Sequence, residues 1–143
     1  MTVHLLDVNV LLALMWPAHQ GHQLAQDWFA ENARSGWATC PFTQAGCIRI
    51  LSNPSFSSDF LTLQEAVKLL TANLNHPSHL FWPDDLSFPE AVESVLKQLQ
   101  GHQQVTDAYL LGLALRRKAR LATLDRGVSS LLPRDKQAAI VVL

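Results

Sequence analysis

Short apolar runs alternate along this 143-residue chain with longer segments whose apolar residues recur at helical spacing. Five runs are predicted to be buried strands: Val3–Leu6, Trp37–Cys40, His79–Trp82, Leu121–Leu124 and Ala139–Leu143. Helices are predicted between them: Asn9–Trp16, Ala18–Arg34, Thr43–Leu51, Thr62–Leu74, Ser87–Leu99 and Val105–Lys118. This alternation predicts a mainly parallel sheet with helices on both faces, and a single α/β domain over residues 1–143.

Hydroxyl side chains stand at three of the predicted helix starts. Thr43 and Thr106 are expected to cap the helices that follow them, and Thr62 with Glu65 has the spacing of a capping box. A cap at Thr106 places Asp107 in the first turn of its helix.

The composition supplies enough apolar side chains for an ample buried core, since 48% of the residues are hydrophobic. No apolar run approaches the roughly 20 residues of a membrane-spanning helix. Met1–Leu6 has neither a basic stretch nor a cleavage site, so we expect no signal peptide and a cytoplasmic location. Cys40 and Cys47 match no zinc spacing and are expected to be reduced, buried thiols.

The net charge of -1 argues against a strongly basic nucleic-acid-binding surface. The basic residues are nevertheless clustered, because seven of the eleven lie in one segment: Arg116, Arg117, Lys118, Arg120, Arg126, Arg134 and Lys136. This segment can bind phosphates beside an acidic site, or it can be the solvated end of a helix, where cations are favourable. The two interpretations are compatible.

Three aspartates stand at the ends of predicted elements. Asp7 and Asp125 each follow an apolar strand, where parallel sheets bind their ligands, and Asp107 lies at a helix start that stabilises its charge. Structural explanations exist for Asp107 as helix-start chemistry and for Asp125-Arg126-Gly127 as a turn. Asp7 lies between two apolar runs and needs a partner or a metal. Carboxylates so placed are typical ligands of Mg²⁺ or Mn²⁺, which promote phosphodiester hydrolysis.

The chain resembles the PIN-domain family, and within it the VapC-type toxins. Leu5–Leu12, with Asn9 two residues after Asp7, is similar to the opening of these domains. Val105–Leu111 resembles the third acidic position of the family, and Leu121–Gly127 resembles the fourth, with Thr123 two residues before Asp125. Further matches to one VapC subgroup occur at Pro41–Gln44 and Phe81–Phe88. The matches span nearly the whole chain in the family's order.

This resemblance implies a three-layer α/β/α PIN domain that acts as a metal-dependent endoribonuclease, the toxin of a VapBC-type toxin–antitoxin module. It implies that Asp7, Asp107 and Asp125 bind Mg²⁺ or Mn²⁺ and are catalytic, while Asn9 and Thr123 orient these ligands. The RNA substrate would be steered by Arg126 or by the cluster that begins at Arg116.

The implied partners are RNA, a second copy of the chain and a small antitoxin protein whose C-terminal segment occupies the active-site groove. The apolar helices predicted at Ala18–Arg34 and Thr62–Leu74 are candidate surfaces for these partners. No membrane partner is implied.

One departure from the family concerns its second acidic position, which is usually a Glu on the helix after the second strand. There is no acidic residue between Pro41 and Ser52, and either Gln44 or Gly46 can occupy the equivalent position. Gln44 would offer a carbonyl oxygen without charge. Asp84 or Asp85, beyond the third strand, is expected either to compensate for the missing Glu or to lie in a solvated loop.

Two other functions remain open on the sequence. The missing Glu allows a catalytically weakened PIN-fold protein that binds RNA or an antitoxin. Asp7–Val10 also resembles the nucleophile loop of haloacid dehalogenase-type phosphatases, but that chemistry needs a second Asp where Asn9 stands.

Overall fold

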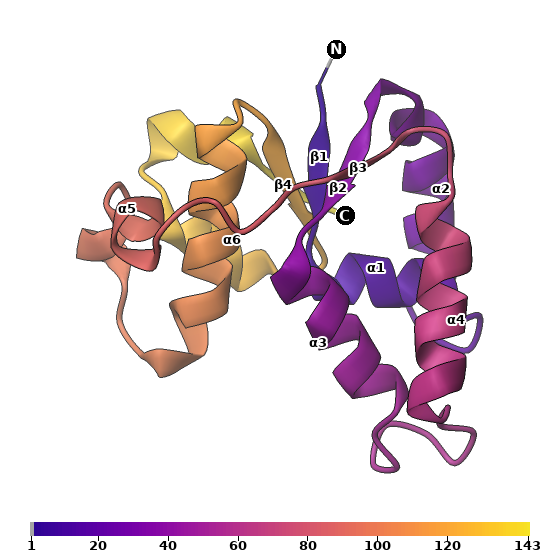
Figure 1. Ribbon diagram of the computed structural model, residues 1–143. Coiled ribbons are helices and arrows are strands. Elements are labelled where there is room, and N and C mark those ends of the chain that lie inside the picture. Colours follow the sequence, from indigo (N-terminus) through magenta and orange to yellow (C-terminus); the bar gives the residue numbers. More distant parts are fainter. Residues whose placement is uncertain (1) are drawn as a thin grey trace.

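The computed structural model describes residues 2–143, and its centre is a five-stranded sheet in which every neighbouring pair of strands is parallel (Figure 1). The strands are β1 (His4–Leu6), β2 (Trp37–Thr39), β3 (His79–Phe81), β4 (Arg120–Thr123) and β5 (Ile140–Val142). Their order in the sheet is β3-β2-β1-β4-β5. In this register Leu5 of the central strand pairs with Ala38 on one side and Leu121 on the other.

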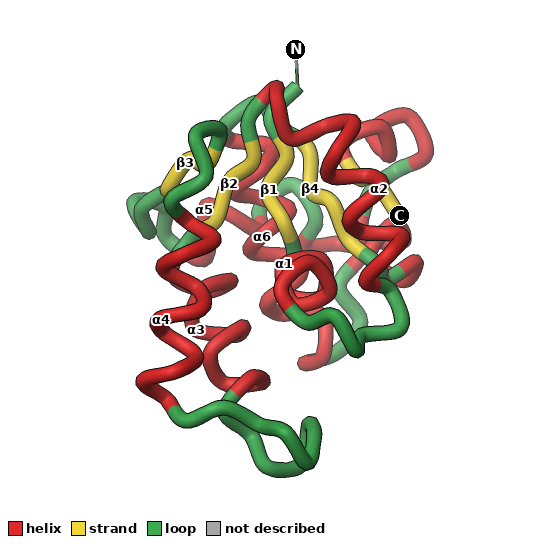
Figure 2. The backbone as a smooth tube through the Cα atoms, turned by 90° about the vertical axis from the view of Figure 1, so that its right-hand side faces the viewer, coloured by secondary structure: helices red, strands yellow, loops and turns green. Residues whose placement is uncertain are grey.

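Helices cover both faces of the sheet, which confirms the three-layer α/β/α arrangement (Figures 1 and 2). They are α1 (Val8–Met15), α2 (His22–Asn32), α3 (Pro41–Leu51), α4 (Leu63–Leu74), α5 (Phe88–Val92) and α6 (Val105–Arg116). Short 3-10 turns lie at Ala33–Ser35, Leu96–Gln98, His102–Gln104, Arg126–Leu131 and Arg134–Ala139. Helices α5 and α6 pack on one face, and α1, α2 and α4 pack on the other.

The alternation of side chains along β1 divides the core in two. Leu5 is buried in the cluster that contains α5 and α6, whereas Leu6 is buried in the cluster that contains α1 and α4. Both side chains are fully buried because successive residues of a strand point to opposite faces and both faces are covered. The apolar runs of β1 and β2 are therefore continuous because both strands are buried on two sides. The prediction of a buried strand was wrong for β3, where Leu80 and Phe81 are exposed because this strand lies at an edge of the sheet.

A close contact between α5 and α6 fixes the position of α6. A Cβ atom added at Gly112 would lie only 1.7 Å from the carbonyl oxygen of Ala91, so this crossing requires a glycine. The backbones of the two helices can then approach closely, and seven residues of α6 are buried. The first turn of α6, which carries Asp107, is held in place by this packing.

The helix starts differ from the prediction at two of the three hydroxyl residues. Thr62 and Glu65 form the expected capping box. Thr43 is not the cap of α3, because the helix already begins at Pro41 and the Thr43 hydroxyl instead bonds back to the backbone of Cys40. Thr106 is not the cap of α6 either, since a 3-10 turn leads directly into Val105.

Three predicted helices are shorter than expected. The segment from Ala18 forms turns until His22, because the Nδ1 atom of His19 accepts a hydrogen bond from the Gly21 amide and stabilises a local turn. The helix predicted over Ser87–Leu99 ends at Val92 and is continued only by turns. The helix predicted over Val105–Lys118 ends at Arg116, and Lys118 follows it with a positive φ of 54°.

Two smaller predictions concern the cysteines and the membrane. Cys40 and Cys47 are buried free thiols, as expected. No helix among residues 2–143 combines the length and the apolar character that crossing a lipid bilayer requires.

We expect His4 to make the protein less stable in acid. Its side chain is only 5% exposed, its Nδ1 atom has no hydrogen-bond partner among residues 2–143, and burial together with the charge of Arg120 lowers its pKa. A native-state pKa below the unfolded value of about 6.5 means that the unfolded chain binds the proton more readily, so stability falls as the pH drops below 6.5. Urea unfolding of His4→Leu should show a higher free energy of unfolding than wild type, with a gap that widens between pH 7.5 and pH 5. A constant gap would contradict this role of the imidazole.

Candidate active site

The three aspartates lie at one end of the sheet, where the connections change sides. Strand β1 is followed by β2 on one side, while β4 and β5 lie on its other side. Open parallel sheets bind ligands at such a point, beyond the carboxyl ends of the strands. Asp7 directly follows β1, and Asp125 is the second residue after β4. Asp107 lies in the first turn of α6, at the end where β1 and β4 finish (Figure 1).

Asp7 is a buried carboxylate whose two oxygens both accept hydrogen bonds. It is only 6% exposed. Its Oδ1 atom accepts from the Val8 amide over 2.7 Å, which caps α1, and its Oδ2 atom accepts from the Thr123 hydroxyl over 2.8 Å. Burial raises the pKa of the Asp7 carboxyl and the charge of Asp125 adds to this, whereas the two hydrogen bonds act in the opposite direction.

The Thr123 hydroxyl connects the groups around Asp7. While it donates to Asp7, its oxygen accepts hydrogen bonds from the Asn9 side-chain amide over 3.2 Å and from the Asp125 backbone amide over 3.0 Å. The Asn9 Oδ1 atom in turn accepts from the Leu124 amide over 3.0 Å. Thr123 and Asn9 therefore join the start of α1 to the end of β4. The backbone amides in this network have no sequence signal, because any residue except proline can supply them.

Asp107 and Asp125 complete the acidic cluster. The Asp125 side chain is exposed, and its Oδ1 atom accepts a hydrogen bond from the Gly127 amide over 2.8 Å. The pKa of Asp107 is raised to about 6, first by burial and then by the charges of Asp7 and Asp125. None of the three carboxylates forms an ion pair with a basic residue in the part of the chain that the structure describes. The cluster is therefore a region of uncompensated negative charge.

The helix after β2 brings no charge to this cluster. The Gln44 amide donates a hydrogen bond to the Thr39 hydroxyl over 3.0 Å, and Thr39 lies 2.7 Å from the Nε2 atom of His79. A Cβ atom at Gly46 would lie 2.8 Å from a methyl group of Val8, the residue that follows Asp7. Gln44 is thus bonded to β2, and Gly46 allows α3 to pack closely against the first turn of α1.

Asp84 and Asp85 differ in their surroundings. Asp85 forms an ion pair with Arg117 over 3.2 Å, and this guanidinium also lies 5.4 Å from the centre of the Trp82 ring. Asp84 is exposed and forms no ion pair within residues 2–143. Burial is the largest cause that raises the pKa of Tyr109, and Cys40, Asp84 and Asp85 add to the shift.

The two arginines predicted to steer RNA lie in different places. Arg126 is exposed beside Asp125 and has no ion pair with any described residue. Arg116 is nine residues after Asp107 on α6, about 14 Å along the helix axis, and lies 3.8 Å from Glu90. Arg126 therefore adjoins the acidic cluster, whereas Arg116 lies at the opposite end of α6.

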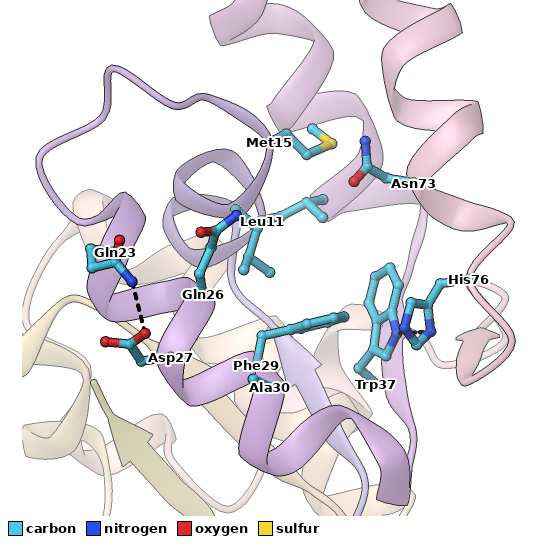
Figure 3. Close-up of a pocket in the computed structure, with 11 residues that line it drawn as sticks. Leu11, Met15, Gln23, Gln26, Asp27, Phe29, Ala30, Trp37, Asn73 and His76 are labelled. Atoms are coloured by element: carbon cyan, nitrogen blue, oxygen red, sulfur yellow. Dashed lines mark hydrogen bonds between the residues drawn. The ribbon is translucent and has the colours of Figure 1, made fainter.

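A cavity of about 450 Å³ between α1, α2 and α4 is separate from the acidic cluster (Figure 3). Leu11, Met15 and Phe29 line its apolar part. The Trp37 indole also lines it and donates a hydrogen bond to His76 over 3.2 Å. None of the three aspartates borders this cavity, so the candidate active site does not extend into it.

Comparison with known proteins agrees with this architecture. The model of the PIN domain family matches residues 4–131. Ribonuclease VapC38 of Mycobacterium tuberculosis is 40% identical over 139 residues, which cover 97% of this chain and 96% of that protein. Ribonuclease VapC39 of the same organism is 42% identical, covering 87% and 90%, and Ribonuclease VapC29 is 42% identical, covering 92% and 91%. The chain therefore belongs to the PIN-domain family, among proteins named as VapC ribonucleases.

Proposed function

We propose that this protein is a VapC-type toxin, a metal-dependent endoribonuclease that hydrolyses RNA phosphodiester bonds in the cytoplasm. The observation that carries the proposal is the convergence of Asp7, Asp107 and Asp125 at the carboxyl end of the sheet, without a basic partner among the described residues. The names of the relatives as ribonucleases support the choice of RNA as substrate.

The donor chemistry of the cluster fits Mg²⁺ or Mn²⁺. Mg²⁺ prefers oxygen ligands and is often held by only one or two carboxylates, with water completing its coordination. Within residues 2–143, no group of three or more Asp, Glu, His or Cys side chains is arranged so that it could hold a metal ion by itself. Such an ion, when bound, activates a water molecule and neutralises the charge that develops on the phosphodiester. We therefore assign its binding to Asp7, Asp107 and Asp125.

The other groups of the site position these carboxylates and the substrate. The hydrogen bond from Thr123 fixes the orientation of the Asp7 carboxylate. The Asn9 side chain donates a hydrogen bond to Thr123 and accepts one from the Leu124 amide. Arg126, exposed and beside the cluster, is placed to attract a phosphate of the RNA backbone. Arg116 is the less favourable candidate because it lies beside Glu90 at the far end of α6.

Replacement of Asp7 tests the proposed chemistry. In the presence of Mn²⁺ or Mg²⁺, purified wild-type protein should cleave a mixed single-stranded RNA, and EDTA should abolish the cleavage. Asp7→Asn should lower the rate more than about 100-fold, since it removes the charge of a metal ligand and leaves one acceptor oxygen for the two donors, Val8 and Thr123. Asp59→Asn, at an exposed aspartate outside the cluster, is the matched control and should retain full activity.

The same assay decides between the two functions that the missing Glu leaves open. Robust metal-dependent cleavage would exclude a protein that has lost catalysis. Wild-type protein that binds RNA but does not cleave it with either metal would instead favour the RNA-binding alternative, for which the acid-free start of α3 is the supporting observation.

Replacement of Asp107 tests the electrostatic cost of the cluster. Its folded-state pKa of about 6, against an ordinary value of 3.8, means that the native protein disfavours the charged form. The loss of folding stability caused by this charged carboxylate is complete above pH 6. It disappears as the pH falls below 3.8, the pKa of the group in the unfolded chain. In EDTA at pH 7.5, Asp107→Asn should therefore raise the free energy of unfolding by about 1 kcal/mol, a figure reduced for solvent screening.

Urea unfolding at pH 7.5 and pH 4.5 measures this effect, and the gain should shrink at the lower pH. Added Mn²⁺ should raise the melting temperature of the wild type more than that of the variant. An Asp107→Asn protein that is less stable than wild type in EDTA at pH 7.5 would show that the carboxylate is structural.

We further propose that the protein forms a homodimer and binds a small antitoxin. The apolar side chains of Leu24 on α2 and of Leu63 and Val67 on α4 are exposed. Together with the cavity between α1, α2 and α4, they provide apolar surface that suits protein partners. Light scattering of the isolated chain should give twice its mass of 15.9 kDa, and a value of 15.9 kDa would contradict the dimer.

A further inference from the structure

Three aromatic side chains form a row near the starts of α3 and α6. The ring centres of Phe42 and Tyr109 are 4.9 Å apart with an angle of 49° between the planes. Those of Phe88 and Tyr109 are 6.2 Å apart with an angle of 12°. Tyr109 is only 3% exposed, whereas Phe42 is 47% and Phe88 is 39% exposed. The row therefore has a buried centre and two exposed ends.

The fold places this row at the same end of the sheet as the aspartates. Phe42 is the second residue of α3, which begins directly after β2. Tyr109 is two residues after Asp107 in α6, so it lies near the same end of this helix, but the two side chains leave the helix on different sides. Its hydroxyl donates a hydrogen bond to the carbonyl oxygen of Leu86 over 3.0 Å, which fixes the ring that Phe42 and Phe88 contact. The two exposed rings thus rest on a rigid support.

The chemistry of the row suits a nucleobase better than a phosphate. The face of an aromatic ring stacks on any unpaired base, and this is how proteins commonly hold single-stranded RNA. The adjacent charges are acidic: Asp85 is paired with Arg117, but Asp84 has no ion pair among the described residues. That charge repels phosphate, so a nucleotide at the row would turn its base towards the rings and its backbone away from Asp84.

We propose that Phe42, supported by Tyr109 and continued by Phe88, is a stacking platform for one unpaired base of the RNA, next to the phosphodiester that is cleaved. This inference rests on the proposed ribonuclease function and adds to it a binding site for single-stranded RNA. An unpaired base is required, because a base inside a duplex has no free face for the ring.

The test compares Phe42→Ala with Phe60→Ala, because Phe60 is a phenylalanine of similar exposure, 45%, in the segment between α3 and α4. Both changes are made in full-length protein carrying Asp7→Asn, so that the RNA stays intact. The probe is an unstructured 12-nucleotide RNA with the fluorescent base 2-aminopurine at one position at a time. Stacking on a ring quenches this fluorescence.

We expect quenching at one position of the probe, its loss in Phe42→Ala and a dissociation constant raised about 10-fold. Phe60→Ala should match the parent protein, and Phe42→Trp should restore the quenching. In the active protein, Phe42→Ala should raise KM about 10-fold with little change in kcat, because the ring holds a base and not the reacting atoms.

Other outcomes separate the two proposals. Cleavage by wild-type protein with Phe42→Ala indistinguishable from Phe60→Ala would overturn the platform and leave the ribonuclease intact. A wild-type protein that cleaves no RNA but shows quenching that depends on Phe42 would refute the ribonuclease and retain the base-binding site. A change of molecular mass in Phe42→Ala would show that the row is a subunit contact, and this too would overturn the platform.

Discussion

The hydrogen bond from the Thr123 hydroxyl to the Asp7 carboxylate joins the ends of two strands, and the rest of the candidate site is arranged around it. A hydroxyl offers one donor and two acceptor positions, and Thr123 uses all three, for Asp7, Asn9 and the Asp125 amide. Because Thr123 is fully buried, its rotamer is fixed by packing. The site is therefore built on strand ends, which hold side chains more rigidly than loops do.

The same arrangement concentrates like charges that the fold alone does not neutralise. The pKa of Asp107 shows the effect most clearly, since burial raises it and both other aspartates add to the shift. The position of Asp107 is imposed from elsewhere: α6 is pressed against α5 at Gly112, where no side chain fits. Strong packing at one point of the helix thus holds a carboxylate where its charge is unfavourable, a combination typical of functional sites.

The sequence predicted the sheet well because its inner strands β1 and β2 are buried on both faces, and it predicted where Asp7 and Asp125 lie because strand ends follow from the strands. It predicted the ends of helices less well. Thr43 resembles a cap, but Pro41 is favourable at a first helical position and starts α3 earlier. The pairing of Arg117 with Asp85 joins residues that are 32 apart in the chain, so no local pattern reveals it. The Phe42 contact with Tyr109 was missed for the same reason.

The missing glutamate is best understood from the packing of α3. Gly46 lets this helix approach Val8 so closely that a side chain there would displace the residue next to Asp7. The Gln44 amide donates a hydrogen bond to the Thr39 hydroxyl of β2, and the same hydroxyl contacts His79 of β3. Helix α3 thus contributes polarity and close packing but no charge. The negative charge of the cluster comes from Asp7 after β1, Asp107 in α6 and Asp125 after β4, while Asp84 acts on Tyr109 in the aromatic row.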